Sequence, residues 1–190
     1  GSPKYIEYAH DIKSSSVHLL ELVNDILDLS AIEAGKQPLN KEDLVVVDVV
    51  TDCTPIISAA ATEKGVHFSI DITNDLPIIH ADKRALKQIL FNLLSNAVKY
   101  TRPGGKISLL AAALDTSLVF TISDTGVGVS ADKLETLTDP FVRSESDPLV
   151  AQEGSGLGLA IVKSLVEMHD GKLNIESEVG VGTKVTVVLP

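Results

Sequence analysis

The first part of the chain, from Tyr5 to Ile32, carries apolar residues three and four positions apart. This spacing places them along one side of a helix that turns about 100° per residue. Gly35 and Pro38 then end the pattern, as glycine and proline commonly do at the end of a helix. Because a lone helix cannot bury such a stripe, we expect it to pack against another helix or another chain.

The remainder of the chain switches between helical spacing and strand-like alternation. Helices are predicted over 45–64, over 83–100 with Asp82 as the N-cap, and after Gly156 as far as His169. Strands are predicted at 37–43, 66–72, 78–80, 106–113, 118–123, 173–178 and 183–189, and 124–156 is expected to be rich in loop. These elements predict an α+β fold, a two-layer sandwich of helices on a mixed, mostly antiparallel sheet. Residues 1–35 should form a separate helix and 36–190 one domain.

The composition is that of an ordinary globular protein, with 44% hydrophobic and 22% charged residues. A net charge of −10 argues against a nucleic-acid partner, which would need a basic face. The single Cys53 excludes an internal disulfide framework and is expected to be a small core residue in a reducing compartment. No apolar run approaches the ~20 residues that span a membrane, and Gly1-Ser2 resembles a tag-cleavage scar. We therefore expect a cytoplasmic piece of a longer protein, without membrane contact of its own, even if that protein is membrane-anchored.

Polar side chains form a stripe along the helix predicted after Asp82. Asn92, Asn96 and Lys99 lie at positions i, i+4 and i+7, beside an apolar face. Such a stripe is commonly a solvated face, but amide oxygens also suit a magnesium ion whose other ligands are phosphates and waters. Lys99 on the same stripe can neutralise phosphate charge. The apolar face consists of Leu86, Ile89, Leu90, Leu93 and Ala97.

Two glycine-rich segments follow this helix. Asp124 comes after an apolar strand and precedes Gly126 and Gly128, which allow a close approach of the backbone. Further along, the run Gly154-Ser155-Gly156-Leu157-Gly158 opens a helical stretch. A glycine-rich turn that leads into a helix presents unpaired N–H groups and the positive end of the helix dipole to an anion. The three elements in this order predict a nucleotide site.

These segments resemble, in sequence and in order, the boxes that form the ATP site of sensor histidine kinases. The N box is matched by Asn92–Thr101, the G1 box by Asp124–Gly128, the F box by Asp139–Phe141 and the G2 box by Gly154–Leu159. This family belongs to the GHKL superfamily, shared with gyrase, MutL and heat-shock chaperone ATPases. The stretch through Ser30 is similar to the second helix of the family's dimerisation hairpin, in the form found in cell-cycle kinases of the PleC and DivJ type.

The resemblance implies a role for each matching residue. Asn92 and Asn96 would hold Mg²⁺ and the phosphates, with Asn96 the closer metal ligand, and Lys99 would contact phosphate. Tyr100 would pack against adenine, and Asp124 would accept a hydrogen bond from its amino group, which guanine replaces with a carbonyl. The catalytic set would be Asn92, Lys99 and Arg143. The nucleotide contacts would come from Asn92, Asn96, Lys99, Tyr100, Asp124, Gly126, Gly128, Phe141, Gly154, Ser155, Gly156, Leu157, Gly158 and Thr183.

The stretch between Phe141 and Gly154 has no clear period, and the resemblance makes it the ATP lid. Phe141 would be the hinge that packs at its start. Arg143 would either reach the γ-phosphate or remain a solvated surface residue. Thr183, in the last glycine turn, would either lie near adenine or belong to an ordinary β-turn.

A histidine kinase also needs a histidine that accepts the γ-phosphoryl group. His10-Asp11 resembles the start of that motif, but the proline expected after the Ser/Thr is absent and no second helix follows before the catalytic domain. His10 and His18 are therefore expected on the second hairpin helix, as packing or surface residues. His67, His80 and His169 have no acid or metal pattern around them and are expected to be structural. The acceptor histidine would then lie outside this chain.

The resemblance predicts a domain that binds MgATP and transfers its γ-phosphoryl group to a histidine, for relay to an aspartate of a response regulator receiver domain. The hairpin helices would form a homodimer in the whole protein, and this fragment would lack autophosphorylation in cis. Two alternatives stay open: a non-catalytic nucleotide-sensing or docking module, and a gyrase- or MutL-like ATPase. The second is disfavoured because those ATPases carry a catalytic glutamate where this chain has Gln88.

Overall fold

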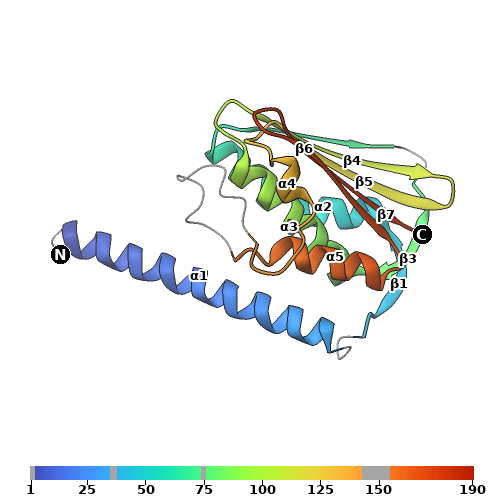
Figure 1. Cartoon of the computed structure of the whole chain (residues 1–190), viewed down its shortest axis with the longest axis horizontal. Coiled ribbons are helices and arrows are strands. Elements are labelled where there is room, and N and C mark those ends of the chain that lie inside the picture. The colour runs from blue at the N-terminus through green and yellow to red at the C-terminus, as the bar shows by residue number, and fades with distance from the viewer. Residues whose placement is uncertain (1–2, 35–37, 74–75, 143–154) are drawn as a thin grey trace.

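The computed structural model describes residues 3–34, 38–73, 76–142 and 155–190. Figure 1 shows a twisted sheet with helices layered on one face and one long helix outside that layer. The helices are α1 (Pro3–Glu33), α2 (Val46–Glu63), α3 (Lys83–Tyr100), α4 (Ala131–Leu134) and α5 (Gly158–Met168). The strands are β1 (Lys41–Val45), β2 (His67–Ile72), β3 (Ile78–Asp82), β4 (Lys106–Leu114), β5 (Ser117–Asp124), β6 (Lys172–Glu178) and β7 (Gly182–Leu189).

The main sheet has five strands in the order β2-β4-β5-β7-β6. The β2–β4 pair is parallel and the other pairs are antiparallel, which confirms the mixed, mostly antiparallel sheet expected from the sequence. Side chains alternate between the two faces of each strand, so Phe120 and Ile122 of β5 share the face that α2, α3 and α5 cover. Both side chains are buried there with Val185 and Val187 of β7.

Helix α3 lies at the centre of the helical layer. Its expected apolar face is buried along its whole length, at Leu86, Ile89, Leu90, Leu93 and Ala97. Asp82 caps it as expected, because its Oδ1 accepts a hydrogen bond from the Ala85 N–H at 3.0 Å. Cys53 of α2 is buried, as expected of a small core residue.

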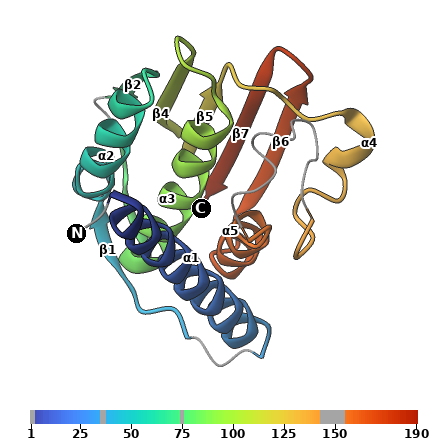
Figure 2. The same ribbon diagram turned by 90° about the vertical axis from the view of Figure 1, so that its left-hand side faces the viewer.

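Helix α1 lies outside this layer and contacts α5 (Figure 2). Leu29, near its C-terminal end, is buried in the core of the domain. The stripe before it remains largely uncovered, with exposed side chains at Tyr5, Tyr8, Ile12, Leu19, Leu20, Val23, Ile26 and Leu27. Over the part of the chain that the structure describes, no helix combines the length and apolar character that a membrane span requires.

The start predicted for the first strand was wrong. The strand expected over 37–43 is β1, which begins only at Lys41, opposite Asp82 of β3. The preceding Asn40 N–H bonds the Asp82 side chain at 2.8 Å rather than a backbone carbonyl of β3. β1 and β3 also form a two-stranded sheet of their own. The region expected to be rich in loop contains α4, which at a single turn is too short to show a periodic pattern.

Candidate nucleotide-binding site

The polar stripe of α3 faces the beginning of α5. Asn92 Nδ2 donates a hydrogen bond to the Gly158 carbonyl oxygen at 3.3 Å. Asn96, one turn further along α3, also points there, since a Cβ placed on Gly158 would lie 3.9 Å from Asn96 Nδ2. The stripe is therefore half-buried between two helices rather than solvated on an open face. The bond that Asn92 makes uses its Nδ2 and leaves its Oδ1 as an acceptor.

The N-terminus of α5 presents unpaired backbone donors. The side chain of its N-cap, Leu157, makes no capping bond. Within α5, Ile161 is the first residue whose N–H bonds back along the chain, to the Leu157 oxygen at 2.9 Å. Among the described residues, no acceptor is found for the N–H groups of residues 158–160. Donors of this kind, at the positive end of a helix dipole, attract phosphate groups.

Asp124 is the last residue of β5 and is partly buried. Its Oδ1 accepts the N–H groups of Gly126, at 2.8 Å, and of Thr183, at 3.3 Å. No hydrogen bond to Oδ2 is found in the described ranges. Burial raises the pKa of this carboxyl group, and the two N–H donors act in the opposite direction. The site therefore holds a partly desolvated acceptor with one oxygen available to a ligand.

Two glycine-containing turns, 126–128 and 180–182, pack closely against each other beside Asp124. Gly128 has φ +67°, and a Cβ there would overlap the carbonyl oxygen of Glu178. Gly182 has φ +138°, and a Cβ there would overlap the carbonyl oxygen of Asp124. The Gly180 N–H also bonds the Val127 oxygen at 2.9 Å. The last glycine turn is thus part of the same local structure as the Asp124 turn, and it brings Thr183 next to Asp124.

The C-terminal end of α3 carries Lys99 and Tyr100. Lys99 Nζ lies 4.9 Å from the centre of the Tyr100 ring, within the range of a cation–π contact. The Lys64 ammonium group donates to the Val98 carbonyl at 2.8 Å and also to that of Lys99. The Tyr100 carbonyl accepts the Val127 N–H at 3.2 Å. This end of α3 is therefore fixed to the turn after Asp124.

Phe141 does not pack as the expected hinge. Its side chain is 63% exposed, and its backbone adopts φ +65°. The Phe141 N–H instead bonds the Gly156 oxygen at 3.0 Å, so the two segments are joined through the main chain. Arg143 and Gly154 lie outside the described residues.

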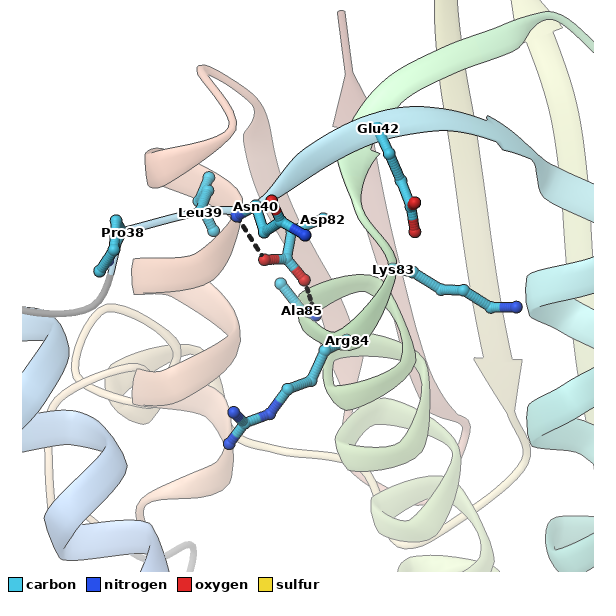
Figure 3. A pocket seen from close by; sticks show the side chains of 8 residues that line it. All are labelled: Pro38, Leu39, Asn40, Glu42, Asp82, Lys83, Arg84 and Ala85. Atoms are coloured by element: carbon cyan, nitrogen blue, oxygen red, sulfur yellow. Dashed lines mark hydrogen bonds between the residues drawn. The ribbon is translucent and has the colours of Figure 1, made fainter.

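Two hollows border these elements. One, of about 350 Å³, is lined by Pro38, Leu39, Asn40, Glu42, Asp82, Lys83, Arg84 and Ala85 (Figure 3). Its central carboxylate, Asp82, already accepts the N–H groups of Asn40 and Ala85, so we regard it as a junction between the linker and α3. The other, of about 240 Å³, borders the Asp124 turn at Thr125, Gly126 and Val127.

The structure adds two polar residues that the sequence interpretation missed, Ser177 and Asp25. Ser177 of β6 accepts the Val129 N–H at 2.8 Å and contacts Thr183. The alternation of β6 offered a signal, because Leu173, Ile175 and Ser177 share one face and only the serine is polar. Ser155 bonds Asp25 of α1, a contact between residues too far apart in sequence for any local pattern to indicate.

Several known proteins are similar to this chain. Residues 81–190 match the family model described as histidine kinase-, DNA gyrase B-, and HSP90-like ATPase. The chain is 44% identical over 184 residues to an uncharacterized sensor-like histidine kinase of Rhizobium meliloti (strain 1021), covering 97% of this chain and 35% of the relative. It is 38% identical over 189 residues to the histidine protein kinase DivJ of Caulobacter vibrioides, covering 100% of this chain and 32% of the relative.

A solved structure has the same fold over the whole chain. Full-length ShkA in complex with AMPPNP is similar with a TM-score of 0.85 and 32% identity, covering 100% of this chain and 39% of that chain. The chain thus spans about a third of the length of these relatives.

Proposed function

Because the chain belongs to the histidine kinase-, DNA gyrase B-, and HSP90-like ATPase family and carries the ATP-binding domain of a sensor histidine kinase, we propose that it supplies the γ-phosphoryl group of ATP to a histidine. The acceptor would pass the group to an aspartate of a response regulator receiver domain. The observation that carries the proposal is that the Asn92 and Asn96 amides lie beside Gly158, the first residue of α5. Phosphoryl transfer asks a protein mainly for positioning and charge compensation, and this junction is suited to both.

We place the triphosphate of ATP at the start of α5 and its adenine beside Tyr100 and Asp124. The N–H groups of residues 158–160, for which the described residues offer no acceptor, would bind the triphosphate, with Lys99 supplying positive charge. Tyr100 would lie against adenine, and Asp124 Oδ2 would accept its amino group. Among the described residues, no three His, Cys, Asp or Glu side chains converge on a metal position. Mg²⁺ would therefore be held through the Asn96 and Asn92 amide oxygens together with the phosphates, whose charge it would offset.

We further propose that residues 1–35 are the second helix of a dimerisation hairpin and that 36–190 are the catalytic domain. The apolar stripe of α1 supports this division, because it is largely exposed along the helix before Leu29. In a homodimer of the whole protein that stripe would be covered by the partner helices. Neither His10 nor His18 would be the phosphoryl acceptor, which another helix would supply.

Calorimetry and labelling together test this function. Titration with ATP should release or absorb heat, and omission of Mg²⁺ should weaken binding. With γ-labelled ATP, the chain should transfer label to a supplied hairpin that carries an acceptor histidine, and should not label itself strongly. No heat with ATP in folded protein would refute the nucleotide site. Acid-labile self-labelling that is lost in His10→Ala would refute the helix assignment.

One contact favours a second function, that of a nucleotide-sensing docking module without phosphoryl transfer. The bond between Ser155 and Asp25 joins the glycine turn to α1, so occupancy of the site could be transmitted to a partner of that helix. ATP binding without any transfer to the supplied hairpin would support this module over the kinase.

A further inference from the structure

Three polar residues form one row across adjacent strands at the end of the sheet. Thr183 of β7 lies directly opposite Asp124 of β5 on one side and Ser177 of β6 on the other. Side chains that are directly opposite each other share a face of the sheet, and here it is the face that the helices cover. The next row along the strands is apolar, with Ile122, Val185 and Ile175 in the corresponding positions.

The Ser177 hydroxyl makes three contacts with a single proton. It accepts the Val129 N–H at 2.8 Å, and it lies 2.9 Å from both the Gly182 carbonyl oxygen and Thr183 Oγ1. A carbonyl oxygen can only accept, so the Ser177 proton goes to Gly182. The one arrangement that satisfies all three contacts has the Thr183 hydroxyl donating to Ser177.

This arrangement fixes what Thr183 can offer to a ligand. Its hydroxyl donates to Ser177, and its N–H donates to Asp124 Oδ1 at 3.3 Å. Its Oγ1 can then present only lone pairs, as the Asp124 carboxylate does. Asp124 and Thr183 thus present only hydrogen-bond acceptors to a ligand. Such a row can bind an amino group, which donates, but leaves a carbonyl oxygen without a donor.

We propose that Ser177 is a positioning residue that fixes the Thr183 hydroxyl as a hydrogen-bond acceptor and thereby makes the site select a purine with a 6-amino group over one with a 6-carbonyl group. This inference rests on the proposed function, because it needs the base of ATP to lie beside Asp124. Without Ser177, the Thr183 hydroxyl is free to turn and donate to a 6-carbonyl oxygen. Loss of Ser177 should therefore reduce the preference for a 6-amino purine over a 6-carbonyl purine, rather than only weaken binding of both.

The test compares Kd values for ATP and inosine triphosphate, which differ only in the 6-amino group and the proton on N1. Wild-type protein should prefer ATP. Ser177→Ala should lower the ratio of the Kd for inosine triphosphate to the Kd for ATP about threefold to tenfold, as expected for one hydrogen bond. Ser177→Thr, which keeps the hydroxyl, should keep the ratio near that of wild type.

A double-mutant cycle separates this role from a structural one. In a Thr183→Val background, Ser177→Ala should not change the ratio further, because Ser177 acts through the Thr183 hydroxyl. Equal weakening of both nucleotides by Ser177→Ala, or the same narrowing in the Thr183→Val background, would overturn the inference. If Ser177→Ala does not fold, Thr183→Val by itself must still narrow the ratio, and an unchanged ratio would overturn it. Wild-type protein that binds neither nucleotide would instead refute the proposed function.

Discussion

Ser155 in the glycine-rich turn and Asp25 in α1 are joined by a hydrogen bond, with 2.8 Å between Ser155 Oγ and Asp25 Oδ2. The same Oγ accepts the Leu157 N–H at 3.1 Å, so this one hydroxyl both shapes the turn and holds the helix. A second bond, from Gln88 Nε2 to Asp28 Oδ2 at 2.9 Å, attaches α1 to α3. Gln88 thus holds α1 against α3.

Asp25→Ala should loosen α1 from the domain. Loss of one hydrogen bond to a charged group that is not fully buried costs about 1 kcal/mol, so amide exchange in the last turns of α1 should speed up about fivefold. Hydrogen exchange measured by mass spectrometry checks this. Ser16→Ala, which removes a bond within α1 to the Ile12 oxygen, is the matched control and should leave exchange in those turns unchanged. Equal effects of the two variants would contradict a docking role for Asp25.

Asp124→Asn should weaken nucleotide binding while stabilising the empty domain. An amide keeps an oxygen for the Gly126 and Thr183 N–H groups, but its other end donates toward the adenine amino group. We expect ATP affinity to fall about tenfold or more, measured by calorimetry.

The stability effect of Asp124→Asn has a defined pH dependence. Burial raises the folded-state pKa of Asp124, so between the unfolded and folded values the native state binds more protons and stability falls as pH rises. The variant should therefore melt at a higher temperature than wild type at pH 7, and the difference should vanish below the ordinary carboxyl value of 3.8. Asp71→Asn, at an exposed position of β2, is the control for charge. A lower melting temperature for Asp124→Asn at pH 7 would contradict this account.

Asn96→Ala should reduce the part of ATP affinity that depends on Mg²⁺. The lost amide oxygen is a proposed metal ligand, so the ratio of Kd values without and with Mg²⁺ should shrink about tenfold. Titrations with ATP in the absence and in the presence of Mg²⁺ measure the two Kd values. Asn174→Ala, on the exposed side of β6, is the control. A uniform loss of affinity in both conditions would show that Asn96 does not act through the metal.

Asp82→Ala should destabilise the domain through the start of α3. The substitution removes a helix cap and a bond to Asn40, so we expect a loss of about 1–2 kcal/mol in the free energy of unfolding, measured with urea. Burial would raise the pKa of Asp82, but the backbone donors outweigh it and hold the pKa below its ordinary value. The stabilisation should therefore be present above 3.8 and disappear as pH falls through the lowered value. A loss that persists at low pH would point to packing rather than to the carboxylate.

Helices could be predicted where apolar residues recurred at helical spacing over several turns, and strands where apolar and polar residues alternated over several residues. The apolar face of α3 is an example, because burial of Leu86 through Ala97 follows directly from helical spacing. The same spacing placed Asn92 and Asn96 on one stripe. What that stripe would face could not be deduced from periodicity, since Gly158 belongs to another helix far along the chain.

The remaining features depend on how distant segments pair. Nothing in the sequence near β1 indicates that it pairs with β3 in a sheet separate from the other five strands. The role of Ser177 likewise appears only when β6 is aligned with β7, which brings it opposite Thr183. The pairing register of a strand is set by the side chains of all the strands that pack on the buried face of the sheet. A local pattern therefore predicts that a segment is a strand but not which strand it pairs with.

Strand β7 lies between β5 and β6, and of the described strands it is the last in sequence. During synthesis on a ribosome, β6 therefore has no neighbour in the sheet until β7 has emerged. The Asp124 carboxylate also waits for its Thr183 donor until then. A nascent chain would first bring α3 and α5 together, and the end of the site that we propose to bind the base would be completed afterwards.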